Sequence, residues 1–169
     1  KESISGLVLD LRRNGGGSLE EAIRLTGLFM KSNPVVQQRD SRDRVEPRYS
    51  RSAEPMYSGP LIVVTDRASA SASEICAAAL QDYGRAVVVG DKATFGKGTV
   101  QTILGVGEHM PLFSEKDRAG TLKVTIQKFY RISGGSTQRR GVIPDLILPT
   151  IYDALEKGAA SLKYALEFD

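Results

Sequence analysis

Serines set among very small residues are the groups in this sequence best suited to nucleophilic chemistry. The segment Ala68–Glu74 reads ASASASE, with three hydroxyls and nothing larger than serine before the glutamate. A serine at the start of a helix lies beside the positive end of the helix dipole and beside unpaired N–H groups, which stabilise developing negative charge. The structural alternative is a helix cap, because Ser71–Glu74 also fits a capping box. The segment alone leaves both interpretations open.

One lysine has the surroundings of a general base. Lys97 lies between two glycines in the segment Thr94–Thr99 (TFGKGT), close to Phe95. Apolar surroundings disfavour the ammonium form and lower the pKa of a lysine, and a neutral lysine can accept a proton. A phosphate-binding P-loop is the main alternative. It fits poorly, because one residue too many follows Gly90 and Gly98 replaces the Ser or Thr that binds magnesium.

Three consecutive glycines form a candidate oxyanion-binding loop. They lie in Arg13–Ser18 (RNGGGS), between a predicted strand and a predicted helix. Glycines allow positive φ and leave backbone N–H groups unobstructed, which suits a bound oxyanion. A tight strand-to-helix turn is the alternative, and the G-x-G-x-x-G spacing of a dinucleotide site is absent. The later segments Gly134–Gln138 and Gly141–Asp145 are predicted to be turns.

Histidine and cysteine are too rare for several kinds of site. The sequence contains a single histidine, His109, and a single cysteine, Cys76. These counts exclude a multi-histidine metal cage, an internal disulfide and a Cys-rich metal site. His109 has a loop-like context and is predicted at the surface, whereas Cys76 is predicted in the core. If a serine is the nucleophile, lysine is therefore the predicted base. Ser–Lys pairs are a known variant of nucleophilic catalysis.

Composition places the chain among globular proteins of one-domain size. It has 169 residues, of which 41% are hydrophobic and 25% charged. This balance excludes a disordered tail, and no apolar run is long enough to span a bilayer. The net charge of +3 is too small to indicate nucleic-acid binding. Residues 39–55 mix acidic and basic side chains, which predicts a solvated hairpin or loop.

Hydrophobic periodicity predicts an α/β fold. Strand, helix and strand follow one another with short connections, which indicates right-handed crossovers and a parallel sheet. Alternating patterns later in the chain indicate additional antiparallel strands. The predicted buried strands are 6–11, 59–64 and 86–89, the antiparallel strands are 99–104 and 122–130, and the helices are 19–30, 70–83 and 152–168.

These segments, in this order, resemble the tail-specific or carboxy-terminal processing peptidases, a family of Ser–Lys endoproteases. The resemblance covers nearly all of residues 4–150, and it is specific because several unusual segments recur together. It is carried by GLVLDLRRNGGG from Gly6, VTDRASASASEI from Val64, QDYGRA from Gln81, TFGKGTVQ from Thr94, IQKFYR from Ile126, GGSTQ from Gly134 and GVIPD from Gly141.

The resemblance implies a role for individual residues. Ser71 matches the family nucleophile, with Ser69 and Ser73 as the competing assignments. Lys97 matches the general base, and Gln101 matches the residue that orients this lysine.

Other positions match supporting parts of the family's site. Asp82 matches an aspartate needed for full activity and is expected to support the site rather than carry a proton. The expected oxyanion hole consists of the Ala72 N–H and an N–H of the glycine loop, from Gly16 or Gly17. The link from Gly90 to Thr94 is one residue longer than usual in that family. A loop can absorb one residue, but Lys97 need not then point at Ser71 as it does in the family.

The resemblance also implies the wider setting. The expected fold is α/β, with a parallel-sheet crossover core of the crotonase or Clp-protease kind, additional antiparallel strands and a C-terminal helix. Residues 1–150 are expected to be a partial catalytic core that begins after the family's PDZ domain, and residues 151–169 a C-terminal helix. The expected setting is periplasmic or exported.

Two functions from different classes remain open on this basis. The first is a serine endopeptidase that cleaves polypeptides near their C-termini through an acyl-enzyme, with no metal or nucleotide cofactor. Its expected binding partners are polypeptide substrates and either an adaptor protein or further copies of the same chain. Nucleic acid is not an expected partner. The alternative is a fragment that binds peptide along exposed strands, or depends on assembly, and does not cleave.

Overall fold

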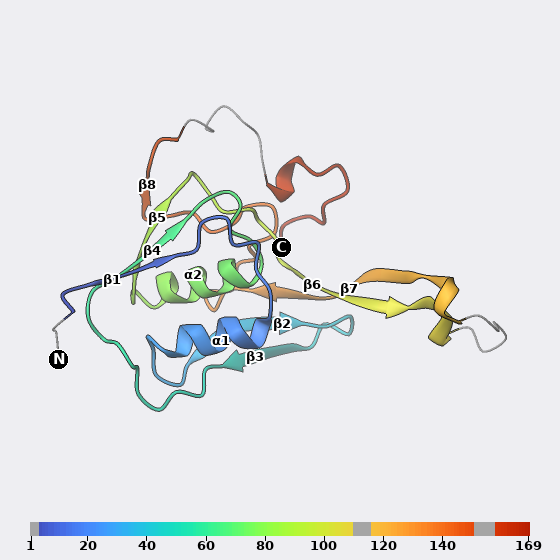
Figure 1. Cartoon of the computed structure of the whole chain (residues 1–169), viewed down its shortest axis with the longest axis horizontal. Coiled ribbons are helices and arrows are strands. Elements are labelled where there is room, and N and C mark those ends of the chain that lie inside the picture. Colours follow the sequence, from blue (N-terminus) through green and yellow to red (C-terminus); the bar gives the residue numbers. More distant parts are fainter. Residues whose placement is uncertain (1–3, 110–115, 151–157) are drawn as a thin grey trace.

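The computed structural model describes residues 4–109, 116–150 and 158–169. Figure 1 shows the α-helices packed among the sheets and a long hairpin that projects from the body. Within the described residues, no helix is long and apolar enough to cross a bilayer. The helices are α1 (Leu19–Gly27) and α2 (Ala72–Asp82), with 3-10 turns η1 (Val106–His109), η2 (Lys116–Ala119) and η3 (Ala159–Ser161).

The first sheet has four parallel strands in the order β1-β4-β5-β8. The three apolar runs predicted as strands form its first three members, which confirms the parallel crossover core. The fourth strand directly follows the turn predicted at Gly141–Asp145, at residues for which no element was predicted, and it pairs with β5 through Val89 and Gly90. The bounds are β1 Leu7–Asp10, β4 Leu61–Thr65, β5 Val87–Gly90 and β8 Leu146–Ile147.

The second sheet is antiparallel, in the order β3-β2-β7-β6. The predicted strands at 99–104 and 122–130 form the β6–β7 hairpin, which confirms the antiparallel prediction. Residues 39–55 form a turn and the edge strand β3, mostly exposed, as expected of a solvated hairpin. The bounds are β2 Pro34–Arg39, β3 Val45–Tyr49, β6 Thr99–Gly105 and β7 Thr121–Tyr130.

The helices α1 and α2 share one core with both sheets. The start of α1 is capped as predicted, since the Glu21 N–H donates to the Ser18 hydroxyl at 3.4 Å. Gly84, at φ +62°, ends α2 as predicted. The core residues Val63, Val88 and those of the inner face of α2 are almost fully buried. Figure 1 shows α2 lying between the parallel sheet and α1, so the start of α2 is held from both sides.

The strands of the parallel sheet are buried on one face only, although their apolar runs predicted buried strands. Val8, Ile62 and Val87 lie in register across β1, β4 and β5, and their side chains are 62%, 41% and 45% exposed. Parallel sheets are usually covered on both faces. Among the described residues, no layer covers these three side chains. The prediction that the strands are buried therefore holds for one face of the sheet and is wrong for the other.

The predicted C-terminal helix is wrong for the part that the structure describes. Residues 151–157 lie outside the described residues, and from Gly158 onward only the short turn η3 is helical. Distant groups bind this segment: the Gln138 side chain donates to the Leu166 carbonyl at 3.0 Å. The Asp169 carboxylate accepts hydrogen bonds from Arg39, Lys128 and Tyr130 at 2.8, 2.8 and 2.9 Å. These contacts override the local helical period.

Candidate active site

Ser71 immediately precedes α2 in a strained backbone conformation. Its φ of 56° and ψ of −114° are unusual for a residue other than glycine. The Ser71 N–H donates to the Glu74 carboxylate at 2.7 Å, which helps to hold this conformation. The half-buried serine lines a cavity at the start of the helix, where the dipole favours negative charge.

The two competing serines are occupied by structural hydrogen bonds. Ser69 is fully buried, and its hydroxyl donates to the Leu11 carbonyl at 2.8 Å. The Ser73 hydroxyl donates to the Asn14 carbonyl at 3.0 Å. Of the three hydroxyls in this segment, only that of Ser71 belongs to a residue lining the cavity shared with Lys97.

One cavity of about 140 Å³ brings most of the predicted site residues together. Ser71 and Ala72 line it from the start of α2, Gly17 from the glycine loop, Lys97 from the segment before β6, and Gln101 from β6 itself. The remaining lining residues are mainly apolar: Leu19, Ile75, Thr99, Val100 and Phe129. The cavity therefore combines a hydroxyl and an amine with an apolar wall, as ligand-binding cavities commonly do.

Lys97 is half-buried, and the surroundings favour its neutral form. Partial burial lowers the pKa of the Lys97 amine below its ordinary value; the charge of Lys123 adds to the decrease and Glu74 opposes it. A lowered pKa of Lys97 is also what the residues around it predict. Within the described residues Lys97 has no ion-pair partner, and no direct hydrogen bond joins its amine to the Ser71 hydroxyl. In free enzymes such contacts often tighten only when substrate binds.

Glu74 connects the backbone of the serine to the backbone of the lysine. One carboxylate oxygen accepts from the Ser71 N–H at 2.7 Å and the Lys97 N–H at 3.0 Å. The other accepts from the Thr94 hydroxyl at 2.5 Å and the Gly96 N–H at 2.7 Å. Burial raises the pKa of Glu74, and these four hydrogen bonds oppose the rise. All four groups donate, so they match an ionised carboxylate.

From the sequence, Glu74 is predicted only to be part of a helix cap. The hydrogen bond to the Ser71 N–H is indeed half of a capping box. The bonds to residues 94–97 are long-range and leave no local pattern. The signal available in the sequence was a glutamate inside an otherwise small and apolar helix start, since carboxylates are rarely buried without partners.

The Lys97 segment packs against the later glycine-rich turns. The Thr137 hydroxyl donates to the Lys97 carbonyl at 3.0 Å, and the Gly98 N–H donates to the Gln138 side chain at 2.8 Å. A β-carbon at Gly98 would lie 2.6 Å from the Ser136 hydroxyl oxygen, so this approach requires glycine. The turns predicted at 134–138 thus form the support behind Lys97.

The longer link before Lys97 is fixed at both ends. Asp91 is buried and accepts from the Arg67 guanidinium at 2.9 Å. Thr94 is held by Glu74 and donates its N–H to the Val142 carbonyl at 3.1 Å. The exposed Lys92 lies between these anchors. The link can therefore contain an extra residue while Lys97 still lines the cavity with Ser71.

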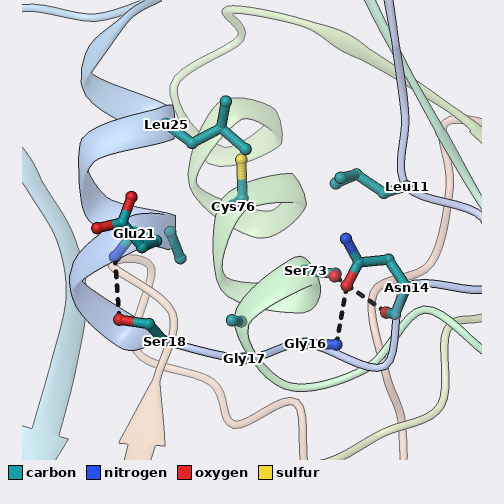
Figure 2. Close-up of a pocket in the computed structure, with 11 residues that line it drawn as sticks. Leu11, Asn14, Gly16, Gly17, Ser18, Glu21, Leu25, Ser73 and Cys76 are labelled. Atoms are coloured by element: carbon teal, nitrogen blue, oxygen red, sulfur yellow. Dashed lines mark hydrogen bonds between the residues drawn. The ribbon is translucent and has the colours of Figure 1, made fainter.

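Asn14 ties the glycine loop to the start of α2 (Figure 2). Its carbonyl accepts from the Ser73 hydroxyl and the Ala70 N–H, both at 3.0 Å. Its side chain accepts from the Gly16 N–H at 3.0 Å. A β-carbon at Gly16, where φ is +97°, would lie 2.7 Å from the Ser71 β-carbon, so only glycine permits this close approach.

The N–H groups available for an oxyanion follow from this arrangement. The Gly16 N–H is occupied by Asn14. The N–H groups of Gly17 and Ala72 have no hydrogen-bond partner within the described residues, and both residues line the cavity with Ser71. Of the two glycines left open by the sequence, the geometry favours Gly17.

Cys76 and His109 lie where they were predicted. Cys76 is buried beneath the glycine loop, at a second cavity of about 140 Å³ shown in Figure 2. Burial raises the pKa of its thiol to about 11, so it is a poor nucleophile at neutral pH. His109 is exposed in η1, at the far end of the β6–β7 hairpin. Neither residue lines the cavity of Ser71.

Asp82 lies at the opposite end of α2 from Ser71. The helix has 11 residues, or about 16 Å of length, so Asp82 cannot touch the reacting atoms. Its carboxylate binds the Arg131 guanidinium through both oxygens, at 2.5 and 3.1 Å, and accepts from the Ser133 hydroxyl at 3.2 Å. Arg131 follows β7, which carries Phe129 of the cavity wall. Asp82 is therefore placed to hold β7 against α2.

Replacing Asp82 by asparagine is expected to lower the free energy of unfolding by about 2 kcal/mol, because a largely buried, bidentate charge pair is broken. Urea unfolding measures the loss. The control is Asp43→Asn, since the exposed Asp43–Arg39 pair is expected to contribute little. Equal losses in the two variants would contradict a specific clamp at Asp82.

Comparisons with known proteins identify the family. The sequence model of peptidase family S41 matches residues 1–148. This chain belongs to peptidase family S41. The chain is 46% identical over 168 residues to the tail-specific protease of Haemophilus influenzae, covering 99% of this chain and 24% of that protein. It is 38% identical over 148 residues to the carboxy-terminal-processing protease of Bartonella bacilliformis, covering 87% of this chain and 32% of that protein.

A solved structure of an S41-like protease supports the fold. The photosystem II D1 C-terminal processing protease matches with a TM-score of 0.72 and 31% identity, over 86% of this chain and 35% of that one. The α/β class inferred from the sequence is thereby confirmed. The chain spans only about a quarter to a third of the length of these S41 relatives.

Proposed function

We propose that this chain is the catalytic part of a serine endopeptidase that cleaves polypeptides near their C-termini. The observation that carries the proposal is the single cavity lined by Ser71, Lys97, Gly17 and Ala72. Membership of peptidase family S41 and the names of the two bacterial relatives support the reaction and the region of the substrate.

The proposed mechanism uses Lys97 as the only proton carrier. The neutral amine takes the proton of the Ser71 hydroxyl while the serine oxygen attacks the peptide carbonyl carbon. The resulting ammonium gives this proton to the leaving amine as the peptide bond breaks, which leaves an ester on Ser71. Lys97 then takes a proton from water, and the hydroxide formed attacks the ester. Lys97 then returns its proton to the Ser71 oxygen as the ester bond breaks, which restores the serine hydroxyl and releases the new C-terminal carboxylate.

In this proposal, the remaining groups of the cavity stabilise the oxyanion, orient the lysine amine and contact the substrate. The Gly17 and Ala72 N–H groups hold the oxyanion, supported by their lack of partners among the described residues. Losing one such donor typically costs about 10²–10³ in rate. Gln101 orients the lysine amine, supported by its place on the same cavity wall. The apolar wall, which includes Phe129, receives an apolar substrate side chain.

The proposal predicts a covalent adduct at Ser71. A fluorophosphonate probe is expected to label the folded chain at this residue, located by peptide mass spectrometry. Labelling should disappear in Ser71→Ala and persist in Ser41→Ala, which changes an exposed serine of the β2–β3 turn. Heat-denatured protein controls for unspecific reaction. Labelling at Ser69 or Ser73, or no adduct at any pH, contradicts the proposed nucleophile, and the second result supports the peptide-binding alternative.

A further inference from the structure

A third, larger cavity adjoins the one that contains Ser71. It measures about 550 Å³ and lies between the β6–β7 hairpin and segment 158–169. Lys97, Thr99 and Gln101 line both cavities, so the two share a wall. The Lys97 side chain is therefore bordered on one side by the proposed nucleophile and on the other by this hairpin cavity.

The pairing of β6 with β7 places another lysine on the same wall. Gln101 pairs with Thr125, and Lys123 lies two residues before Thr125 in β7. Alternate residues of a strand share a face, so Lys123 and Thr125 point to the same side. Both line the hairpin cavity with Lys97 and Gln101. The Lys123 side chain on β7 and the Lys97 side chain, two residues before β6, thus line one cavity, and a third lysine, Lys163, lines it from segment 158–169.

Neither Lys97 nor Lys123 forms an ion pair within the described residues. The ion pairs of the neighbourhood go elsewhere: Lys128 binds Asp169, and Arg139 binds Glu167. Amines that line one cavity with no carboxylate among its lining residues cannot all be charged without mutual repulsion. Lys123 is exposed to solvent whereas Lys97 is half-buried, so the repulsion is relieved more readily by loss of the proton from Lys97.

We propose that Lys123 is a positioning residue for the reaction, whose positive charge favours the neutral form of Lys97, the form that accepts the Ser71 proton. This inference rests on the proposed function, because it deepens the role of the same lysine. Lys123 itself transfers no proton and touches no reacting atom.

The charged groups around Lys97 act in identifiable directions. From β7, Lys123 disfavours the ammonium form; from α2, the Glu74 carboxylate favours it. Lys163 lines the opposite wall of the hairpin cavity on segment 158–169, where its amine lies 5.2 Å from the centre of the Tyr164 ring. Partial burial of Lys97 acts in the same direction as Lys123. Removing Lys123 therefore leaves Glu74 less opposed, and the pKa of Lys97 rises.

The direct test measures the titration of Lys97 by NMR of the full chain carrying ¹³C-labelled lysine, with Lys97→Met assigning the signal. The Lys97 midpoint is expected to move to higher pH in Lys123→Met and further in Lys123→Glu. Lys123→Arg should restore the original midpoint, because arginine keeps the charge. The control Lys31→Met removes an equal charge from an exposed pair with Glu54 and should leave the midpoint unchanged.

The kinetic test follows fluorophosphonate labelling of Ser71 across pH. At neutral pH Lys123→Met is expected to label about threefold more slowly, and the two rates should converge at high pH, where Lys97 is neutral in both. Salt at about 1 M should shrink the difference, because it screens an exposed charge.

Each proposal can fail separately. An unchanged Lys97 midpoint in Lys123→Met, or an equal change in Lys31→Met, overturns the role of Lys123 even if Ser71 is labelled. Absence of any Ser71 adduct in the unmodified chain overturns the proposed function, while the NMR titration still reports whether Lys123 acts on Lys97. A slower reaction in Lys123→Met that persists equally at high pH would indicate structural damage and contradict the inference.

Discussion

Replacing Lys97 by methionine is expected to slow fluorophosphonate labelling of Ser71 by about 10²–10⁴, the range that a positioned general base contributes. Lys97→Arg should be no better, because a guanidinium cannot give up its proton. The fold should survive both changes, since the Lys97 side chain makes no ion pair within the described residues. Labelling rates and thermal unfolding, recorded on the same samples, measure the two effects.

The sign of the stability change separates a base from a structural lysine. Partial burial lowers the pKa of Lys97 in the folded chain, so the unfolded chain binds this proton more tightly. At pH values below the folded pKa, the charged amine therefore costs folding free energy, and Lys97→Met should be at least as stable as the unmodified chain. The control Lys92→Met changes an exposed lysine of the preceding link and should affect neither property. A methionine variant that unfolds readily would contradict this account.

Replacing Glu74 by alanine is expected to be the most damaging single change to the site. Four donors would lose their acceptor at once: the N–H groups of Ser71, Gly96 and Lys97, and the Thr94 hydroxyl. Burying such unpaired groups should lower the free energy of unfolding by about 3–5 kcal/mol. Labelling of Ser71 should fall by at least about 10², because both the serine and the lysine lose their support.

Glutamine at position 74 provides the matched comparison. Its carbonyl oxygen can still accept from the Ser71 and Lys97 N–H groups, while its amide faces Thr94, whose hydroxyl can accept, and the Gly96 N–H, which cannot. Glu74→Gln is therefore expected to lose less stability than Glu74→Ala. Glu54→Gln, at an exposed surface pair, should have almost no effect. Urea unfolding that ranks alanine and glutamine equally would rule out the hydrogen-bonded link.

The parts of the site that depend on residues close together in the sequence could be predicted. Small residues around Ser71 and glycines around Lys97 indicated a nucleophile and a base, and the structure places both residues in one cavity. The residues alone left three serines open, and only the family resemblance singled out Ser71, because the choice depends on the distant acceptors Leu11 and Asn14. The same holds for Gly16, whose N–H is occupied by a side chain two residues earlier.

The fold was predictable where periodicity decides it and not where tertiary contacts do. Apolar runs gave the strands of the parallel core, and a capping serine gave the start of α1. The period in residues 152–168 was misleading: beyond Gly158 the chain follows the acceptors and cations supplied by β2, β7 and Gln138. No local pattern reports that an aspartate at position 169 will meet Arg39.

The central claim is that a neutral amine activates one hydroxyl, and simultaneous titration tests it most directly. The ¹³C signal of Lys97 and the rate of Ser71 labelling would be followed over the same pH range in the same chain. The account predicts that the labelling rate rises with pH along the curve by which Lys97 loses its proton, below the ordinary pKa of lysine, and that this rise vanishes in Lys97→Met. A Lys97 amine that stays charged while Ser71 reacts, or a pH profile unchanged by Lys97→Met, would contradict it.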